Sequence, residues 1–257
     1  MSLLATRDLT VRFGGHVAVD AVTCSFEPGT LTAIVGPNGA GKTTYFNLIS
    51  GQLRASAGSV TLGGRDLSRL PASERTRAGL GRAFQLTNLF PRLSVLENVR
   101  LAVQASREGR HRRGLNLWSV WSDHGALRAR ADEVLAAVAL RDKEEELVAN
   151  LPHGDQRKLE VALLMALEPQ VFMFDEPTAG MNAAEAPVIL DLIRRLKQDR
   201  SKTILLVEHK MDVVRELADR IIVLHNGALV ADGKPAEVIA LPIVQEAYLG
   251  VAAKEAA

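Results

Sequence analysis

A glycine-rich segment at residues 36–44 carries the clearest chemistry in the sequence. It reads GPNGAGKTT, fits the spacing G-x-x-x-x-G-K-[ST], and comes directly after an apolar run expected to be a buried strand. Backbone N–H groups at the glycines and at the start of the following helix form a concave site for the β- and γ-phosphates of a nucleotide. The residues predicted to line this phosphate loop are Gly36, Pro37, Asn38, Gly39, Ala40, Gly41, Lys42, Thr43 and Thr44.

Two side chains of the loop have more specific expected roles. Lys42 places a positive charge at the phosphates, and the hydroxyl of Thr43 is placed to ligate Mg²⁺. A glycine-rich turn that arose by chance is the alternative, and the order of strand, loop and helix disfavours it. The sequence therefore predicts a protein that binds ATP together with Mg²⁺.

A second candidate site follows the apolar run at 171–174, which ends in Asp175 and Glu176. A carboxylate at the carboxyl end of a strand beside a phosphate loop can hold Mg²⁺, usually through water, and we assign this role to Asp175. Glu176 is one residue further along, where it can polarise a water for in-line attack on the γ-phosphorus as general base. Alone, the pair would fit a helix cap before Pro177 equally well, and the phosphate loop favours catalysis.

The elements that must position these residues can be read from the apolar pattern. Short apolar runs at 31–35, 171–174, 203–207 and 221–224 predict buried strands, and the helical patterns at 42–49 and 184–198 lie between them. This alternation predicts an α/β fold with a mainly parallel sheet. The first 30 residues, with LTVRF, VTCSF and glycine-containing turns, predict a smaller antiparallel β lobe.

The strand signal disappears in the middle of the chain, where residues 126–140 have apolar side chains at helical spacing. We therefore expect one domain over 1–257, in which an inserted helical lobe at 88–167 interrupts a core made of 1–87 and 168–257. A basic run at 107–114, followed by Trp118 and Trp121, is expected to be a solvated loop. Contact with phosphates or lipid headgroups is the alternative for this run.

Composition narrows the class of protein. Lys and Arg total 31 and Asp and Glu total 30, a balance that gives no field for nucleic acid as the main partner. The single cysteine, Cys24, excludes an internal disulfide and is compatible with a reducing compartment. The sequence contains no apolar segment long enough for a signal peptide or a membrane span. We expect a peripheral protein on the cytoplasmic side if it serves a membrane.

Over nearly its whole length the chain resembles the ATPases of ABC transporters, and the phosphate loop and the Asp175–Glu176 pair carry most of this resemblance. The resemblance implies a role for three further residues. Gln85 matches the glutamine that links Mg²⁺ and water to the helical lobe and the membrane subunit, and His209 matches the switch histidine that contacts the γ-phosphate. Phe13 matches the aromatic residue that stacks on adenine.

The resemblance is weaker at two motifs. Residues 179–182, AGMN, occupy the loop that contacts the other subunit of the dimer, and many relatives have aspartate where this chain has Asn182. The family signature L-S-G-G-Q reads LPHGD at 151–155, so that Pro152 supplies neither the hydroxyl nor the N–H of the family serine. Gly154 is still expected to face the phosphate of ATP held by the other subunit, at the start of a helix.

Within the family, the chain resembles the LivG-like group, the longer of the two ATPases in branched-chain amino-acid importers. RFGGHVAVD, FQLTNLFPRLSVLENV, LLVEHKMDVV and the ending GKPAEVIALPIVQEAYLG carry this likeness. It implies an ATPase dimer, homomeric or heteromeric, with two transmembrane permease subunits and a substrate-binding protein at the cell membrane. The cargo stays open among leucine-type, urea-type and aromatic-acid solutes.

Three other functions remain as alternatives. Lipopolysaccharide-export ATPases resemble the core too, but they lack the long insertion around Arg107–Leu127 that this chain shares with the LivG-like group. A non-transport ABC ATPase acting on nucleic acid or ribosomes is disfavoured by the near-neutral charge, and a signalling module without turnover is disfavoured by Glu176 and His209.

Overall fold

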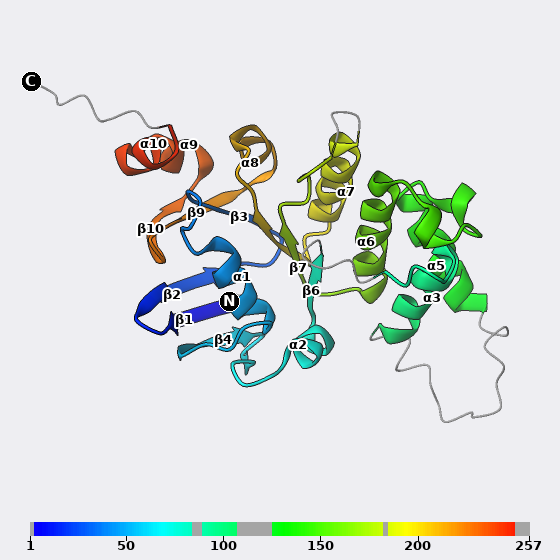
Figure 1. Cartoon of the computed structure of the whole chain (residues 1–257), viewed down its shortest axis with the longest axis horizontal. Coiled ribbons are helices and arrows are strands. Elements are labelled where there is room, and N and C mark those ends of the chain that lie inside the picture. Colours follow the sequence, from blue (N-terminus) through cyan, green and yellow to red (C-terminus); the bar gives the residue numbers. More distant parts are fainter. Residues whose placement is uncertain (1–2, 84–88, 107–124, 182–184, 250–257) are drawn as a thin grey trace, which may run out of the picture. The chain divides into compact units, whose positions relative to one another are not determined.

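The computed structural model describes residues 3–83, 89–106, 125–181 and 185–249 (Figure 1). These residues form two compact units. The first contains the described residues of 1–80, 170–176 and 196–257, and the second those of 81–169 and 177–195. The strands are β1 Leu4–Phe13, β2 His16–Phe26, β3 Leu31–Val35, β4 Ala57–Leu62, β5 Arg65–Asp66, β6 Leu80–Ala83, β7 Val171–Asp175, β8 Thr203–Val207, β9 Arg220–His225 and β10 Ala228–Gly233.

Helices make up much of the remaining described chain. They are α1 Lys42–Ser50, α2 Ala72–Ala78, α3 Val95–Ala105, α5 Gly125–Ala137, α6 His153–Leu167, α7 Ala186–Gln198, α8 Met211–Leu217, α9 Pro235–Ile239 and α10 Pro242–Leu249, with 3-10 turns η2 Arg141–Lys143 and η3 Val148–Asn150. None of the helices in the described residues is both long and apolar enough to span a bilayer.

Two sheets form the strand layers. One has four strands in the order β2-β1-β4-β5, and both neighbours of β1 are antiparallel to it. The other has six strands in the order β10-β9-β3-β8-β7-β6. In this sheet β3 runs parallel to β8 and β9, β7 runs parallel to β8, and β10 is antiparallel to β9. The predicted α/β architecture with an amino-terminal antiparallel layer is therefore confirmed.

The core of the first unit lies on both faces of the six-stranded sheet. Successive residues of β3 point to opposite faces, so Ile34 packs with α1 and the four-stranded sheet, whereas Ala33 and Val35 pack with residues of α8, α9 and α10. Both faces of β3 are covered, and all five of its residues are buried, including the polar Thr32. Helix α1 thus lies between the two sheets (Figure 1).

The second unit is helical, with α3, α5 and α6 packed on one another (Figure 1). Helix α3 begins with a capping box, in which the Ser94 hydroxyl accepts from the Glu97 N–H and the Glu97 carboxylate accepts from the Ser94 N–H. Helix α6 begins after Pro152 and contains the apolar stretch that follows LPHGD. The basic run at 107–114 and Trp118 and Trp121 lie outside the described residues.

Candidate nucleotide-binding site

The phosphate loop joins the end of β3 to the start of α1. Two of its glycines are required by close approaches of the main chain. A Cβ atom on Gly36 would lie 2.2 Å from the carbonyl oxygen of Leu224, and one on Gly41 would lie 2.5 Å from that of Ala18. Gly41 also has a φ of +93°, which residues with a side chain rarely adopt. The glycine spacing of the motif therefore has a steric cause in this fold.

A turn between β9 and β10 braces the same loop. The N–H of Gly227 donates to the carbonyl oxygen of Ala40 at 3.1 Å, and its own carbonyl accepts from the N–H of Asp20 at 2.9 Å. Gly227 thereby connects the phosphate loop to the end of β9 and to β2. The sequence gives no sign of this contact, because a single Gly after Asn226 is the usual composition of a hairpin turn.

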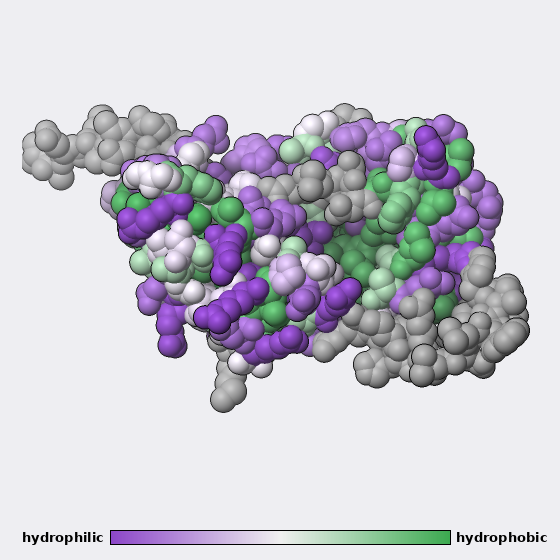
Figure 2. All heavy atoms as spheres, turned by 60° about the horizontal axis from the view of Figure 1, so that its bottom comes forward, coloured by the Kyte–Doolittle hydropathy of each residue, from purple (hydrophilic) through white to green (hydrophobic). Residues whose placement is uncertain are grey.

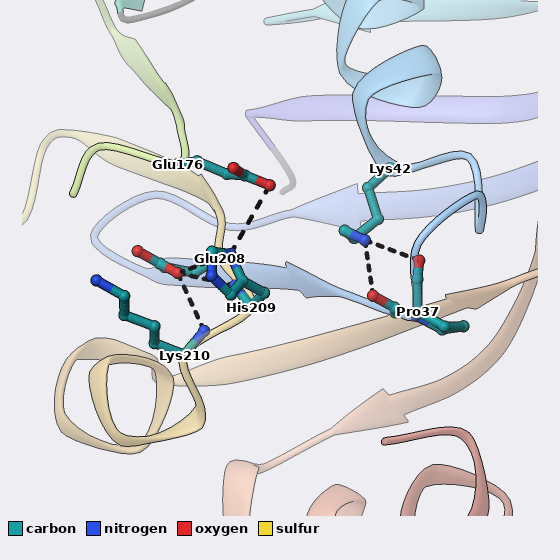
Figure 3. A network of polar contacts seen from close by, with 7 residues as sticks. Pro37, Lys42, Glu176, Glu208, His209 and Lys210 are labelled. Carbon is teal, nitrogen blue, oxygen red and sulfur yellow. Dashed lines mark hydrogen bonds and ion pairs between the residues drawn. The ribbon is translucent and has the colours of Figure 1, made fainter. Parts of the chain in front are cut away.

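Lys42 lies inside the loop that it is expected to serve. Its Nζ atom donates to the carbonyl oxygens of Gly36 at 2.6 Å and Pro37 at 2.9 Å (Figure 3), and the residue is only 8% exposed. Burial lowers the pKa of the Lys42 ammonium below its usual value, while the nearby charges of Glu176 and Asp175 oppose this. The loop thus holds the Lys42 ammonium where the nucleotide phosphates are expected to bind.

The start of α1 supplies the rest of the anion site. Gly41 is the N-cap and has no side chain to bond the first N–H groups of the helix, and the first turn contains no acidic residue. Such a terminus favours a bound anion. Thr43 is exposed in this turn and Thr44 is half-buried, so the Thr43 hydroxyl is accessible to a ligand.

Asp175 and Glu176 lie where β7 ends. Asp175 is the last residue of the strand, pairs with Val207 of β8 and is 8% exposed. The N–H of Glu176 donates to the Val207 carbonyl at 2.9 Å, and Glu176 has a φ of +47°, an uncommon conformation for a residue with a side chain. Its carboxylate is 43% exposed. The chain therefore bends sharply after the buried strand and presents the Glu176 side chain to solvent.

His209 lies beside Glu176. Its Nδ1 atom is 3.8 Å from Oε1 of Glu176 and 3.7 Å from Oε2 of Glu208, and the imidazole is 51% exposed. Figure 3 shows Glu176 and His209 on one side of the site and Lys42 on the other. The structure thus brings together Lys42, Asp175, Glu176 and His209, which are separated by up to 167 positions, at the carboxyl ends of β3, β7 and β8.

The remaining residues predicted for the site belong to other elements. Phe13 is the last residue of β1, and its ring is half exposed, at 51%. Gly154 is in the first turn of α6, in the other unit of the chain. A Cβ atom at Gly154 would be 2.3 Å from Oε1 of Glu185, so the carboxylate packs directly on the glycine. Gln85 and Asn182 lie outside the described residues.

Hard oxygen ligands suited to Mg²⁺ are present at this edge of the sheet. Thr43 offers a hydroxyl and Asp175 a carboxylate, and both lie next to Lys42, whose pKa responds to the charge of Asp175. The described residues contain no cluster of three or more His, Cys, Asp or Glu side chains that would hold a metal ion alone. This donor set fits Mg²⁺, which keeps waters and nucleotide phosphates among its ligands.

The second unit contains an apolar groove of about 420 Å³. Figure 2 shows hydrophobic surface gathered around a hollow in the part of the molecule that contains α3 and α6. Apolar residues that line the groove include Phe90, Leu101, Ala102, Leu163, Leu164 and Leu167. Phe90 is 54% exposed and is nevertheless held firmly, since its N–H donates to Oδ1 of Asn98 at 2.8 Å and its carbonyl accepts from Nδ2 at 3.1 Å.

Comparison with known proteins identifies the family. The family model described as ABC transporter matches residues 19–179, a span that includes the phosphate loop and Glu176. The chain belongs to the ABC transporter family. It is therefore an ATPase, which accords with the arrangement of Lys42, Asp175, Glu176 and His209.

Relatives of this ABC ATPase include transport proteins named for branched-chain amino acids. It is 38% identical over 251 residues to the high-affinity branched-chain amino acid transport ATP-binding protein LivG of Salmonella typhimurium, covering 97% of this chain and 98% of the relative. It is 35% identical over 252 residues to BraF of Pseudomonas aeruginosa, with the same two coverages.

Solved ABC cassettes share the fold of the whole chain. The ADP conformation of the ATP-binding cassette MJ1267 superposes with a TM-score of 0.81 at 28% identity, covering 97% of this chain and 99% of that one. The cassette MJ0796, described as a dimer in a post-hydrolysis state bound to ADP and Pi, gives a TM-score of 0.75 at 26% identity, covering 90% and 98%.

Proposed function

We propose that this ABC ATPase powers the import of branched-chain amino acids or a related small polar solute, with Glu176 as the base that activates water. The observation that carries the hydrolytic part of the proposal is the meeting of Lys42, Glu176 and His209 at one edge of the sheet, and the likeness to LivG and BraF supports the cargo. Phosphoryl transfer to water needs a cation that binds the phosphates, a carboxylate that activates the water and a group that contacts the γ-phosphate. Lys42, Glu176 and His209 can supply these three functions.

The chemical step follows from these positions. ATP binds with its β- and γ-phosphates in the loop, where the ammonium of Lys42 exchanges its bonds to the Gly36 and Pro37 carbonyls for bonds to phosphate oxygens. A water attacks the γ-phosphorus, the bond to the β,γ-bridging oxygen breaks, and ADP leaves with that electron pair. Glu176 accepts a proton from the water, and His209 helps to orient the γ-phosphate.

Thr43, Asp175 and Gln85 would hold Mg²⁺ beside the phosphates. The ion would neutralise charge on the β- and γ-oxygens of ATP. Phe13 would stack its exposed ring on adenine, a contact that any base can make through its π-face.

Gly154 would act on a different nucleotide. In this proposal it lies at the start of α6 facing ATP bound to the partner ATPase, in a dimer where each nucleotide is held between one phosphate loop and the other signature. The dimer named for MJ0796 and bound to ADP and Pi supports such pairing. If the partner is a second copy of this chain, the two nucleotide sites of the dimer are identical. If it is a different ATPase, they differ in their residues.

The apolar groove of the second unit is proposed to receive a cytoplasmic segment of a permease subunit. An ATPase that powers transport must transmit force to a membrane protein, and none of its own described helices can span a bilayer. The groove offers a rigid anchor, since Asn98 bonds the main chain of the half-exposed Phe90. Aromatic and aliphatic side chains around such a pocket are typical of a docking surface. With this role, the chain is proposed to lie at the cytoplasmic face of the cell membrane.

The cargo is tested with the complete transporter in proteoliposomes. The chain is co-purified with any polytopic proteins, second ATPase and binding protein that prove to be encoded beside its gene, and ATP hydrolysis is followed as solute is added. We expect leucine, isoleucine or valine to stimulate hydrolysis when bound to the binding protein. Stimulation by urea or by an aromatic acid alone would reassign the cargo. If no permease is encoded nearby and none co-purifies, the importer assignment fails.

A further inference from the structure

Glu208 is a buried acid beside the catalytic residues. It has no role in the hydrolysis steps proposed for Lys42, Glu176 and His209. It follows the last residue of β8 and is 0% exposed, whereas His209 and Lys210 next to it are exposed. A carboxylate removed from water costs free energy unless protein groups bond it. Its contacts therefore indicate what the fold gains from placing it there.

One oxygen of Glu208 fixes the main chain of the turn that carries His209. Oε2 accepts the N–H of His209 at 2.8 Å and the N–H of Lys210 at 3.1 Å (Figure 3). Both bonds are short-range, so they determine the direction in which the turn leaves β8. The buried Glu208 carboxylate therefore fixes the position of the His209 main chain.

The same oxygen also faces the imidazole ring. Nδ1 of His209 is 3.7 Å from Oε2 of Glu208 and 3.8 Å from Oε1 of Glu176, so two carboxylates lie within 4 Å of this nitrogen, beyond hydrogen-bond distance. The negative charge of both acids favours a hydrogen on Nδ1, because the alternative tautomer would turn the lone pair of that nitrogen toward them. The partner of one ring nitrogen determines the role of the other. Nε2 is then the nitrogen that remains for a phosphate.

We propose that Glu208 is a positioning residue for ATP hydrolysis, which holds the turn at His209 and keeps Nδ1 of the ring close to the acids. This inference rests on the proposed role of His209 at the γ-phosphate. Glu208 does not touch nucleotide in this account. Glu208 restricts the orientations of the His209 imidazole, so that the ring is already in position when ATP binds.

The test compares Glu208→Gln with a matched control in the purified transporter complex. Glutamine keeps the size and a carbonyl oxygen that can accept the two N–H groups, but it lacks the charge. The control is Asp199→Asn, since Asp199 also bonds the main chain two residues on, at Ser201 N–H (3.0 Å), and lies before the other end of β8. We expect Glu208→Gln to lower kcat about ten-fold with KM for ATP within about two-fold, while Asp199→Asn changes neither.

The ¹⁵N chemical shifts of the His209 ring give a readout that does not depend on turnover. In the parental chain we expect the hydrogen on Nδ1, and in Glu208→Gln we expect the tautomer with hydrogen on Nε2 to gain. A parental ring with its hydrogen on Nε2 overturns the proposal, even if Glu208→Gln does not fold. Parental kcat in a folded Glu208→Gln complex also overturns it. Failure of the parental complex to hydrolyse ATP would instead count against the proposed function.

Discussion

At the scale of single residues, Lys42 is the side chain on which nucleotide binding should depend most. Lys42→Ala removes the ammonium that now bonds two loop carbonyls, and no other Lys or Arg occurs in residues 36–44 to replace it. Hydrogen bonds to a charged group contribute about 1.5–3 kcal/mol, so ATP affinity should fall roughly ten- to hundred-fold. Equilibrium titration with labelled ATP measures this.

Lys197→Ala is the matched control for that substitution. Lys197 also donates to a main-chain carbonyl, that of Leu217 at 2.8 Å, and pairs with Asp219. Asp219 precedes β9, and its N–H bonds the carbonyl of Leu31 at the start of β3, the end of the sheet opposite to the phosphate loop. This control should bind ATP like the parent. Equal affinity in Lys42→Ala and the parent would refute the phosphate-loop assignment.

The roles assigned to single residues from motifs stay predictions, although the structure brings several of these residues to one edge of the sheet. Asp175 and Glu176 were predicted from their place at the end of an apolar strand, and His209 from the resemblance to ABC ATPases. Glu208 was missed, because an acid after an apolar run is normally exposed and gives no sign of burial in the sequence. The left-handed conformation of Glu176 has no sequence signal either, since glycine is the residue that normally marks it.

At the scale of elements, the phosphate loop should tolerate a side chain at Gly41 poorly. Gly41→Ala places a Cβ atom 2.5 Å from the Ala18 carbonyl in addition to the conformational cost of a positive φ. Gly64→Ala carries a similar conformational cost, with φ +80°, but no heavy atom of the described residues lies within 4 Å of its Cβ position. We expect Gly64→Ala to lower the free energy of unfolding by about 1 kcal/mol and to leave ATP binding unchanged.

Gly41→Ala should lower both stability and ATP affinity, because the loop and the start of α1 must move away from β2. Thermal unfolding and ATP titration on the two variants separate strain from loop displacement. If Gly41→Ala and Gly64→Ala lose the same stability and bind ATP with the same affinity, the close approach of Gly41 to Ala18 does not affect function.

The start of α6 gives a second prediction at this scale. Pro152 is the N-cap and makes no side-chain cap bond, while the N–H groups of Asp155 and Gln156 bond its carbonyl. Pro152→Ser adds a hydroxyl and an N–H near the proposed phosphate of the partner site. A hydrogen bond to a charged group is worth about 1.5–3 kcal/mol at most, so ATP-driven dimerisation should tighten.

The measurement uses the complex with both ATPases, carrying Glu176→Gln to block hydrolysis, once with proline and once with serine at position 152. If the dimer with Pro152→Ser is no tighter than the dimer with the parental proline, Pro152 does not weaken the signature motif and the prediction is wrong. A serine N-cap also stabilises its own helix by about 1 kcal/mol, so thermal unfolding of the isolated chain is recorded alongside as a correction.

Elements with continuous apolar runs were predicted closely. The runs at 31–35 and 203–207 coincide with β3 and β8, because a strand buried on both faces is mainly apolar, with Thr32 and Thr203 as the polar residues here. Strands β4, AGSVTL, and β10, ALVADG, were not predicted, since each has few large apolar residues and contains glycine. They form because neighbouring strands supply the pairing.

At the scale of the whole molecule, the proposed permease groove can be tested independently of nucleotide chemistry. Leu101→Glu puts a charge on a residue that is 42% exposed and lines the groove. We expect ATP binding to persist and co-purification with the permease to be lost. Leu241→Glu is the control, because Leu241 is equally apolar and 39% exposed but belongs to the first unit. Loss of the permease in both variants would indicate nonspecific damage and contradict the docking assignment.

The division of the chain into units depends on contacts that a local pattern cannot report. The sequence predicted a helical lobe at 88–167, and the helices α3, α5 and α6 occur there. The described residues of 177–195, including most of α7, group with these helices although they follow β7 in the chain. Helical periodicity identifies α7 as amphipathic but does not specify which neighbours cover its apolar face. The lobe boundaries given above remain a prediction.

The central claim is that this ABC ATPase hydrolyses ATP with Glu176 as the base. The most direct measurement is ATP hydrolysis and ATP retention by the purified complex, with parental chain and with Glu176→Gln. The amide keeps the shape of the side chain but cannot accept the proton of the attacking water. We predict that the variant binds ATP with parental affinity, retains it between the two ATPase subunits, and hydrolyses it at least about a hundred-fold more slowly. Hydrolysis by Glu176→Gln at the parental rate would contradict this account.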